Sequence, residues 1–408
     1  MFLNKEKIRN KADEMAKKGY RIIACAIKET KEVNFSDLTF VCLINIEDEI
    51  KDNMKEVIET LKLAGIKTIM ITGDNKNTAY AVGGKIGILT DSAGIINGEE
   101  LKELSDEELY NKIDEIEIVS RALPSDKSRL IKIAQKKNYV VGMTGDGIND
   151  APALKLADVG FSMGSGTEIA KEASDIVILD NNLKSIVTSI LYGRTTFKNI
   201  RKFIMFQLTI NICAITLSVI CPFIGVFQPI TIMQMLWINM IMDTLAGLAF
   251  ATSTPRNDYL LEQPLRKEEK IINNYMKKEI AFGSIYESII LLLFLIFSPI
   301  KKIFTNDELL MTGFFALFIF IAIFNAFNIR THRLKITSGI TKDKIFVIII
   351  IFIIVTQLII IYYGGTLFRT VSINCQQLTI IFLISFSIIP LDLVRKYILK
   401  LKNKNSGV

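Results

Sequence analysis

The sequence has very few side chains of the kind that hold a transition metal. Its only histidine is His332, and its five cysteines form no Cys-x-x-Cys pair. Zinc and haem sites are built from histidine and cysteine, so the sequence argues against both cofactors. We expect reduced, mostly buried thiols at all five positions: Cys25, Cys42, Cys213, Cys221 and Cys375.

Long apolar runs are absent from the first half of the chain and dominate the second. Residues 1–18 form a charged amphipathic pattern, which is not typical of a secretory signal. Charges are spread throughout up to about Leu191, and long apolar runs begin at Phe203. This predicts a soluble half followed by a membrane half. The net charge of +7 does not indicate nucleic-acid binding, because the excess Lys and Arg flank the apolar runs.

The soluble half alternates strand-like and helix-like segments. A helix from Met54 is expected to end at Gly65, and Ser125 is expected to cap a helix that runs to about Gln135. Another helix is expected at 77–86. The alternation predicts a parallel sheet covered on both faces, with chemistry at the carboxyl ends of its strands. The expected strands are 20–28, 38–46, 67–71, 139–143, 159–163 and 175–179.

Two Thr-Gly-Asp sequences follow predicted strands, at residues 72–74 and 144–146. The second opens a longer motif, residues 144–154, which reads Thr-Gly-Asp-Gly-Ile-Asn-Asp-Ala-Pro-Ala-Leu. Its carboxylates Asp146 and Asp150 are one helical turn apart, a spacing that suits Mg²⁺ held beside a phosphoryl group. The motif therefore predicts phosphoryl transfer.

The membrane half divides into six apolar stretches, each long enough to cross a hydrocarbon core of about 30 Å. Lys and Arg gather in the loops at 256–278, 330–344 and 395–404, whereas the alternate loops carry two lysines and one arginine. By the positive-inside rule, the soluble half and the C-terminus are both cytoplasmic. The expected spans are 203–221, 230–252, 279–299, 309–329, 345–363 and 377–394.

Polar residues inside these spans are candidate ion ligands. Asn239 and Asp243 are four residues apart and are expected on one helical face, and Asn211 lies at mid-depth in the first span. An acidic residue at the bilayer centre costs roughly 3 kcal/mol, a cost that a bound cation offsets. The alternative is that these side chains, together with Asn325 and Asn328, make only interhelical hydrogen bonds. Oxygen ligands favour a hard cation such as Ca²⁺, although Mn²⁺ also accepts them.

Three segments of the soluble half resemble the P-type ATPases. Residues 143–166 resemble the hinge signature of that family, and residues 70–74 and 121–127 match its phosphorylation domain. The resemblance implies an α/β phosphorylation domain with a haloacid-dehalogenase-like fold, followed by a six-helix transmembrane α bundle. It also implies ATP as substrate and Mg²⁺ as cofactor.

The resemblance assigns roles to residues of the two Thr-Gly-Asp regions. It implies that Lys127 contacts the phosphoryl group, that Asp146 binds Mg²⁺, and that Asn149 and Asp150 complete the site, Asp150 as a second Mg²⁺ ligand. In the upstream loop, Thr72 and Gly73 would hydrogen-bond the phosphoryl oxygens, beside Asp74. The candidate cofactor-binding residues are Arg121 and Asp48.

The membrane half resembles the plasma-membrane type of calcium pump. The resemblance rests on residues 207–211, residues 234–244 and the Tyr-Gly-Gly turn at 363–365. Pumps of the sarcoplasmic-reticulum type hold two Ca²⁺ and carry two glutamates where this chain has Ala214 and, at about the matching position, Ala322. A single transported Ca²⁺ is therefore expected, bound partly by Asn239 and Asp243 with Asn211 nearby.

The resemblance covers roughly the C-terminal half of a pump. The phosphorylated Asp-Lys-Thr-Gly-Thr sequence does not occur, and the actuator domain, the first four spans and most of the nucleotide domain have no counterpart. The expected domains are 1–33 (tail of the nucleotide domain), 34–195 (phosphorylation domain) and 196–408 (membrane domain). The chain is expected to be inactive alone and to need the missing N-terminal half. The alternatives are a membrane-tethered phosphatase of the haloacid-dehalogenase type and a non-catalytic membrane partner.

Overall fold

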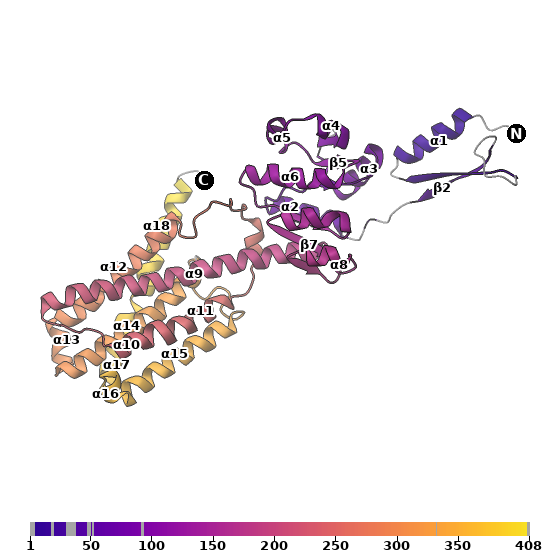
Figure 1. Ribbon diagram of the computed structural model, residues 1–408. Helices are drawn as coiled ribbons and strands as arrows, with labels where there is room; N and C mark the ends of the chain where they lie inside the picture. Colours follow the sequence, from indigo (N-terminus) through magenta and orange to yellow (C-terminus); the bar gives the residue numbers. More distant parts are fainter. Residues whose placement is uncertain are drawn as a thin grey trace. The chain divides into compact units, whose positions relative to one another are not determined.

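Figure 1 shows the computed structural model, which describes residues 5–17, 20–29, 38–46, 50, 53–90, 94–331 and 333–405. The chain divides into two units. Residues 1–192 and 257–269 form the first, here called the α/β unit, and residues 193–256 and 270–408 form the second, the membrane unit. Asp48, one of the predicted cofactor-binding residues, lies outside the described residues.

The first elements form an antiparallel ribbon beside a short helix. Helix α1 (Lys5–Lys17) is followed by β1 (Arg21–Ile27) and β2 (Thr39–Ile46), which pair antiparallel. Both strands were predicted as part of a parallel sheet, and that prediction is wrong for them. A crossover between parallel strands needs about a dozen or more residues, and the connection 28–38 is shorter.

Six further strands form two parallel sheets of three strands each, as the α/β pattern predicts. The first sheet has the order β3-β5-β4 and the second has the order β6-β7-β8. Strands β4 and β5, each three residues long, were not predicted. The strands are β3 (Met70–Ile71), β4 (Ile95–Asn97), β5 (Ile118–Ser120), β6 (Gly142–Gly145), β7 (Val159–Met163) and β8 (Ile176–Ile178).

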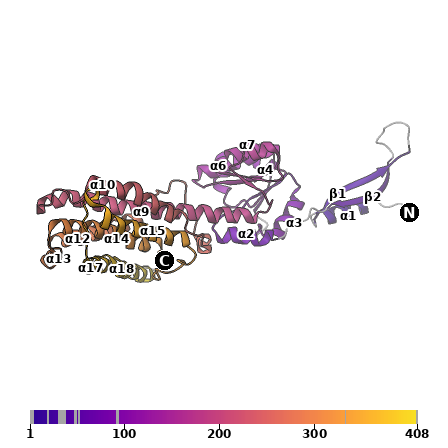
Figure 2. The ribbon, with the colours of Figure 1, turned by 90° about the horizontal axis from the view of Figure 1, so that it is seen from below.

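Helices cover both faces of these sheets (Figure 2). Two consecutive residues of β5 point to opposite faces of the sheet. Ile118 packs among residues of α2 and α3, and Val119 packs among residues of α4, α5 and α6. Both side chains are fully buried. The helices are α2 (Met54–Leu63), α3 (Lys76–Ile86), α4 (Gly98–Glu103), α5 (Asp106–Lys112), α6 (Pro124–Lys136), α7 (Ala151–Leu156) and α8 (Glu168–Glu172).

The helix ends confirm one predicted cap and correct the other. Gly65 follows α2 with a φ of +70°, a left-handed conformation that favours glycine. Ser125 does not cap α6, because the helix already begins at Pro124 and Leu123 is its N-cap. The Asp126 carboxylate accepts a hydrogen bond from the Leu123 amide at 2.8 Å and so provides a partner for the backbone amide of the N-cap residue.

The loop 257–269, which includes η5 (Asn257–Leu261), packs against the α/β unit. The Lys267 ammonium donates to the Asp158 carboxylate at 2.6 Å, and the Val141 amide donates to the same carboxylate at 2.9 Å. Burial alone would raise the pKa of Asp158, but the hydrogen bonds from Lys267, Val141 and Gln135 outweigh burial and lower that pKa.

The lowered pKa predicts that this loop contact weakens in acid. A carboxyl group whose pKa is lower in the folded state stabilises the fold above its unfolded pKa, about 3.9, and loses that contribution as the pH falls through the folded value. Hydrogen exchange of residues 257–269, corrected for the intrinsic pH effect, should show unchanged protection between pH 7 and pH 5 and a loss below pH 4. A Lys267→Met variant should show weaker protection already at pH 7, and equal protection in this variant and the native chain would contradict the assignment.

The membrane unit contains all six predicted spans. Among the described residues, six helical stretches are long and apolar enough to cross a membrane, and α14 is the most buried of them. It packs against α12, α15, α17 and α18. The elements are α9 (Lys184–Ile220), η3 (Cys221–Ile224), α10 (Ile232–Leu236), η4 (Trp237–Met242), α11 (Asp243–Ala251), α12 (Asn274–Ile296), α13 (Ser298–Ile303), α14 (Asp307–Arg330), α15 (Lys344–Tyr363), α16 (Gly365–Phe368), α17 (Cys375–Phe386) and α18 (Ile388–Asn405).

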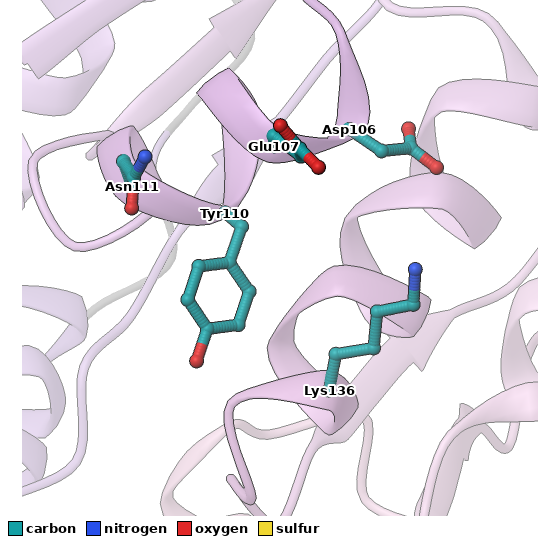
Figure 3. Close-up of a pocket in the computed structure, with 5 residues that line it drawn as sticks. All are labelled: Asp106, Glu107, Tyr110, Asn111 and Lys136. Carbon is teal, nitrogen blue, oxygen red and sulfur yellow. The ribbon is translucent and has the colours of Figure 1, made fainter.

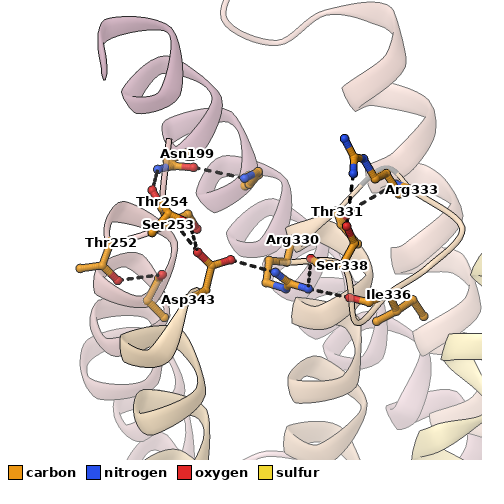
Figure 4. Close-up of polar contacts among 12 residues, drawn as sticks. Asn199, Thr252, Ser253, Thr254, Arg330, Thr331, Arg333, Ile336, Ser338 and Asp343 are labelled. Carbon is orange, nitrogen blue, oxygen red and sulfur yellow. Dashed lines mark hydrogen bonds and ion pairs between the residues drawn. The ribbon is translucent and has the colours of Figure 1, made fainter. Parts of the chain in front are cut away.

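A buried ion pair joins the ends of three of these helices (Figure 4). Arg330, at the end of α14, donates to the Asp343 carboxylate at 2.8 Å, and the two side chains are only 3% and 9% exposed. The other carboxylate oxygen accepts from the amide and the hydroxyl of Thr254, which follows α11. Arg330 also donates to the carbonyls of Ile336 and Ser338.

We expect Asp343→Ala to destabilise the membrane unit strongly. Removing one partner of a buried ion pair leaves the other charge uncompensated, at a cost of about 3–5 kcal/mol. Thermal unfolding of the detergent-solubilised chain should show a clear fall in midpoint. Asp307→Ala is the matched control, because Asp307 is exposed at the start of α14 and its loss should change the midpoint little.

Candidate functional site

The loop after β6 is organised around the Asp150 carboxylate. Asp150 ends the short helix η2 (Ile148–Asp150) and is 8% exposed. One carboxylate oxygen lies 2.5 Å from the Lys127 ammonium on α6, and the other accepts from the amides of Asp146 and Gly147, both at 3.3 Å. The protein therefore occupies both oxygens of Asp150.

Asp146 differs from Asp150 in exposure and in hydrogen bonding, although both belong to the same sequence motif. Its side chain is exposed, and its carboxylate has no hydrogen bond within the described residues. Its backbone is held, because the Asp146 carbonyl accepts from the Thr167 amide at 2.8 Å and a Cβ on Gly166 would lie 3.0 Å from that carbonyl oxygen. A fixed backbone with an open carboxylate at a strand end suits a Mg²⁺ ligand.

The upstream Thr-Gly-Asp sequence forms a second fixed loop. The Thr72 hydroxyl donates to the Asp74 carboxylate at 2.8 Å and accepts from the Asp74 amide at 3.1 Å. The Arg121 amide donates to the Asp74 carbonyl at 2.8 Å, and the Ala122 amide donates to the Thr72 carbonyl at 2.9 Å. Gly73 has open space around it. The loop thus holds backbone and hydroxyl groups at the end of β3.

The segment after β5 connects these two loops. Its Arg121 amide contacts the first loop and its Lys127 side chain contacts the second, so both Thr-Gly-Asp sequences lie against one short stretch of chain. Arg121 itself has a φ of +49°. Asn149 is exposed beside Asp150. The structure therefore brings together the predicted residues of the α/β unit that it describes.

The two sheets leave their strand edges unpaired at this site. Strand β3 is the end strand of one sheet and leads into Thr72, and β6 is the end strand of the other and ends with Thr144 and Gly145, directly before Asp146. Within the described part of the chain, no strand pairing joins β3 to β6. An unpaired strand edge presents backbone N–H and C=O groups that readily form hydrogen bonds with a further strand.

A hollow of about 280 Å³ lies elsewhere on the α/β unit (Figure 3). None of the predicted site residues lines it. The lining residues come from α5 and α6: Asp106, Glu107, Tyr110, Asn111 and Lys136. It is a separate surface depression.

The membrane unit holds a carboxylate without a protein partner. Asp243 is 2% exposed, and both of its carboxylate oxygens are buried with no hydrogen-bond partner in the described residues. Leaving a buried carboxylate unsatisfied is costly, so its burial fits a site that a cation completes. No group of three or more His, Cys, Asp or Glu side chains is found in the described residues.

Asn239 and Asp243, expected on one helical face, differ in burial, and their shared role as ion ligands stays a prediction. Asn239 is exposed, whereas Asp243 is buried, and Asn211 is half-buried on α9. Residues 237–242, directly before Asp243, form a π-helical turn, whose hydrogen bonds span five residues.

Sequence reasoning missed the buried carboxyl group of Glu287. Glu287 is 2% exposed on α12 and accepts a hydrogen bond from the Asn325 amide at 2.9 Å. Asn328 donates to the Ile388 carbonyl at 3.2 Å. The two asparagines thus make interhelical hydrogen bonds, the simpler of the two interpretations. The signal for Glu287 was an acidic residue inside the expected span 279–299.

The parallel sheets with their Thr-Gly-Asp loops, followed by six candidate spans, define a haloacid-dehalogenase-like domain joined to a helical membrane domain. Residues 7–158 and 128–190 match models of haloacid dehalogenase-like hydrolases. Residues 227–398 match the model described as "Cation transporting ATPase, C-terminus".

Calcium pumps are similar along most of the chain. Calcium-transporting ATPase 12, plasma membrane-type, of Arabidopsis thaliana is 39% identical over 82% of the chain, and probable calcium-transporting ATPase 8, plasma membrane-type, of Oryza sativa is 35% identical over 95%. The chain belongs to the P-type cation-transporting ATPases and resembles the plasma-membrane-type calcium pumps. It spans 33% and 38% of the length of these two relatives.

We expect Asp150 to order its loop and Asp146 to be dispensable for that order. Asp150→Ala removes the acceptor of two amides and of Lys127, at a cost of about 1–3 kcal/mol. Amide hydrogen exchange at 146 and 147 should therefore become about ten- to hundredfold faster. Asp146→Asn is the matched control, because it removes no hydrogen bond of the described residues. Equal exchange in the Asp150→Ala variant and the native chain would contradict the assignment.

Proposed function

We propose that the chain is the C-terminal portion of an ATP-driven Ca²⁺ transporter that exports Ca²⁺ from the cytoplasm through an aspartyl-phosphate cycle. The similar proteins named above are described as calcium-transporting ATPases, which supports the choice of ion. Mn²⁺ accepts the same oxygen ligands, so the transport assay below includes it. The proposed domains are those expected from the sequence: 1–33, 34–195 and 196–408.

The single observation that carries this proposal is the pair of unpaired strand edges at the site. A parallel strand that bonded β3 and β6 would complete one continuous sheet, with its carboxyl end beside the Thr72 and Asp146 loops. If that strand led into Asp-Lys-Thr-Gly-Thr, it would supply the aspartyl nucleophile that the chain lacks. We infer that the N-terminal portion of the pump provides it and that the chain alone does not turn over.

The residues of the α/β unit then have separate proposed roles. Asp146, with its open carboxylate, would hold Mg²⁺, whose chemistry is to neutralise charge on a phosphoryl group. Lys127 would add a positive charge near the same group while its contact with Asp150 shapes the loop. Gly73 would donate its amide hydrogen bond to a phosphoryl oxygen, and Thr72 would donate its hydroxyl in exchange for its present contact with Asp74. Asn149 and Arg121 remain candidate contacts at the rim of the site.

In the membrane unit, we propose that Asp243 is a ligand of a single transported Ca²⁺. Neither of its carboxylate oxygens has a hydrogen-bond partner among the described residues, which is the feature expected of a ligand for an ion. Asn239, four residues before Asp243, and Asn211 on α9 are proposed as further oxygen donors. Ala214 and Ala322 are buried and carry no side-chain oxygen, which supports one ion instead of two.

The proposed orientation places the α/β unit and the C-terminus in the cytoplasm. The loops at 256–278, 330–344 and 395–404 collect the Lys and Arg residues, as cytoplasmic loops do. The proposed partners are therefore the lipid bilayer and the N-terminal portion of the pump.

The test is reconstitution of transport from two polypeptides. The chain is co-expressed with an N-terminal fragment of a plasma-membrane-type calcium pump that contains Asp-Lys-Thr-Gly-Thr and four spans, and uptake of radioactive Ca²⁺ into vesicles is measured with and without ATP. We expect ATP-dependent uptake only when both polypeptides are present, with Mn²⁺ uptake measured in parallel. Ca²⁺-dependent ATP hydrolysis by the purified chain alone would contradict the proposed division.

Asp243→Asn should lower Ca²⁺ uptake in the reconstituted pair at least tenfold. An amide lacks the negative charge that offsets the charge of the ion, so the site loses its main electrostatic attraction. Glu308→Gln is the control, because Glu308 is exposed at the start of α14 and should leave uptake unchanged. Binding of two Ca²⁺ per phosphorylation event would contradict the single-ion site.

A further inference from the structure

Two of the five cysteines lie directly opposite each other on the β1–β2 ribbon. Cys25 of β1 and Cys42 of β2 are register partners in the antiparallel pair. Directly opposite residues in such a pair have Cα atoms about 4.5–5.5 Å apart and side chains on the same face of the ribbon. A disulfide requires Cα atoms about 4.4–6.8 Å apart, so the register alone satisfies its main geometric condition.

The two thiols are free, and one of them is accessible. Cys42 is exposed and Cys25 is partly exposed. Desolvation and the neighbouring Cys25 thiol, which acts also as a hydrogen-bond partner, raise the pKa of Cys42. The pKa effect agrees with the closeness that the register implies. Of the other cysteines, Cys213 and Cys221 are buried in the membrane unit and Cys375 is exposed at the start of α17.

We propose that Cys25 and Cys42 are a thiol–disulfide exchange site that forms a reversible cross-strand disulfide with a small disulfide oxidant. The Cys42 thiolate attacks one sulfur of the oxidant, and the other sulfur leaves as a thiolate. The Cys25 thiolate then attacks the Cys42 sulfur of the mixed disulfide and releases the second small thiolate. Two protein thiols and one small disulfide thus give one protein disulfide and two small thiols, and two electrons pass to the oxidant.

The bond would restrain a part of the fold that has little other support. An isolated two-stranded ribbon is marginally stable in water. The pairing of β1 with β2 also changes register just after Cys25, which interrupts the ladder at this point. A covalent link between the strands removes conformations from the opened ribbon, so hydrogen exchange of β1 and β2 should slow on oxidation. The inference does not depend on the proposed transport function.

The experiment is oxidation of the purified full chain with glutathione disulfide, followed by mass spectrometry of intact protein and of unreduced peptides. We expect loss of two hydrogens and a peptide that links Cys25 to Cys42, with the link reversed by dithiothreitol. The rate should rise from pH 7 to pH 9, because the raised pKa of Cys42 leaves little thiolate at neutral pH.

Three substitutions make the test specific. Cys25→Ser should stop the reaction at a stable glutathione adduct on Cys42, because the second thiol is missing. Cys42→Ser should abolish the linked peptide, and Cys375→Ser should leave it unchanged. Hydrogen exchange of β1 and β2 in the reduced variants should match that of the reduced native chain, which shows that the ribbon is intact. Glutathione addition to Cys375 without any Cys25 to Cys42 link would overturn the proposal.

Discussion

The contact between Lys127 and Asp150 is the interaction on which the arrangement of the α/β unit depends most. It joins α6, which follows β5 of one sheet, to the loop after β6, which begins the other sheet. Because Asp150 also accepts from the amides of Asp146 and Gly147, one carboxylate fixes a helix, a loop and the direction of the Asp146 backbone. The exposed carboxylate of Asp146 is positioned by its neighbours and needs no hydrogen bond of its own.

The buried carboxylates of the membrane unit differ in how many partners they have. This difference distinguishes carboxylates that stabilise the fold from the one proposed to bind an ion. Asp343 is as deeply buried as many core residues, yet Arg330 and Thr254 occupy both of its oxygens. At the end of the bundle, Asp392 forms ion pairs with Arg395 at 2.6 Å and with Lys396 at 2.7 Å. Against this background, Asp243 is unusual, because neither of its oxygens has a partner in the described residues.

The sequence predicted what depends on composition and local spacing. The six spans follow from length and apolarity, and β7 was predicted with its observed bounds because Val159–Met163 is a short apolar run between polar segments. Strand β6 begins at Gly142 instead of 139, because Tyr139 and Val140 are apolar but lie on the surface. The antiparallel ribbon, the π turn before Asp243 and the pairing of Asp150 with Lys127 depend on tertiary contacts, which spacing along the chain does not encode.

Both halves of the proposed mechanism depend on groups that the chain positions but does not complete. In the part of the chain that the structure describes, strands β3 and β6 present unpaired edges, and Asp243 presents unpaired oxygens. An unpaired strand edge and a buried carboxylate without a partner each cost free energy. Keeping both is therefore explained if each group binds a partner. A strand between the two Thr-Gly-Asp loops and a cation at Asp243 would remove both costs. Glu287 gives the contrast, because Asn325 on the neighbouring helix already provides its carboxyl group with a partner. Groups that lack a partner among the described residues therefore distinguish the two proposed sites from the scaffold around them.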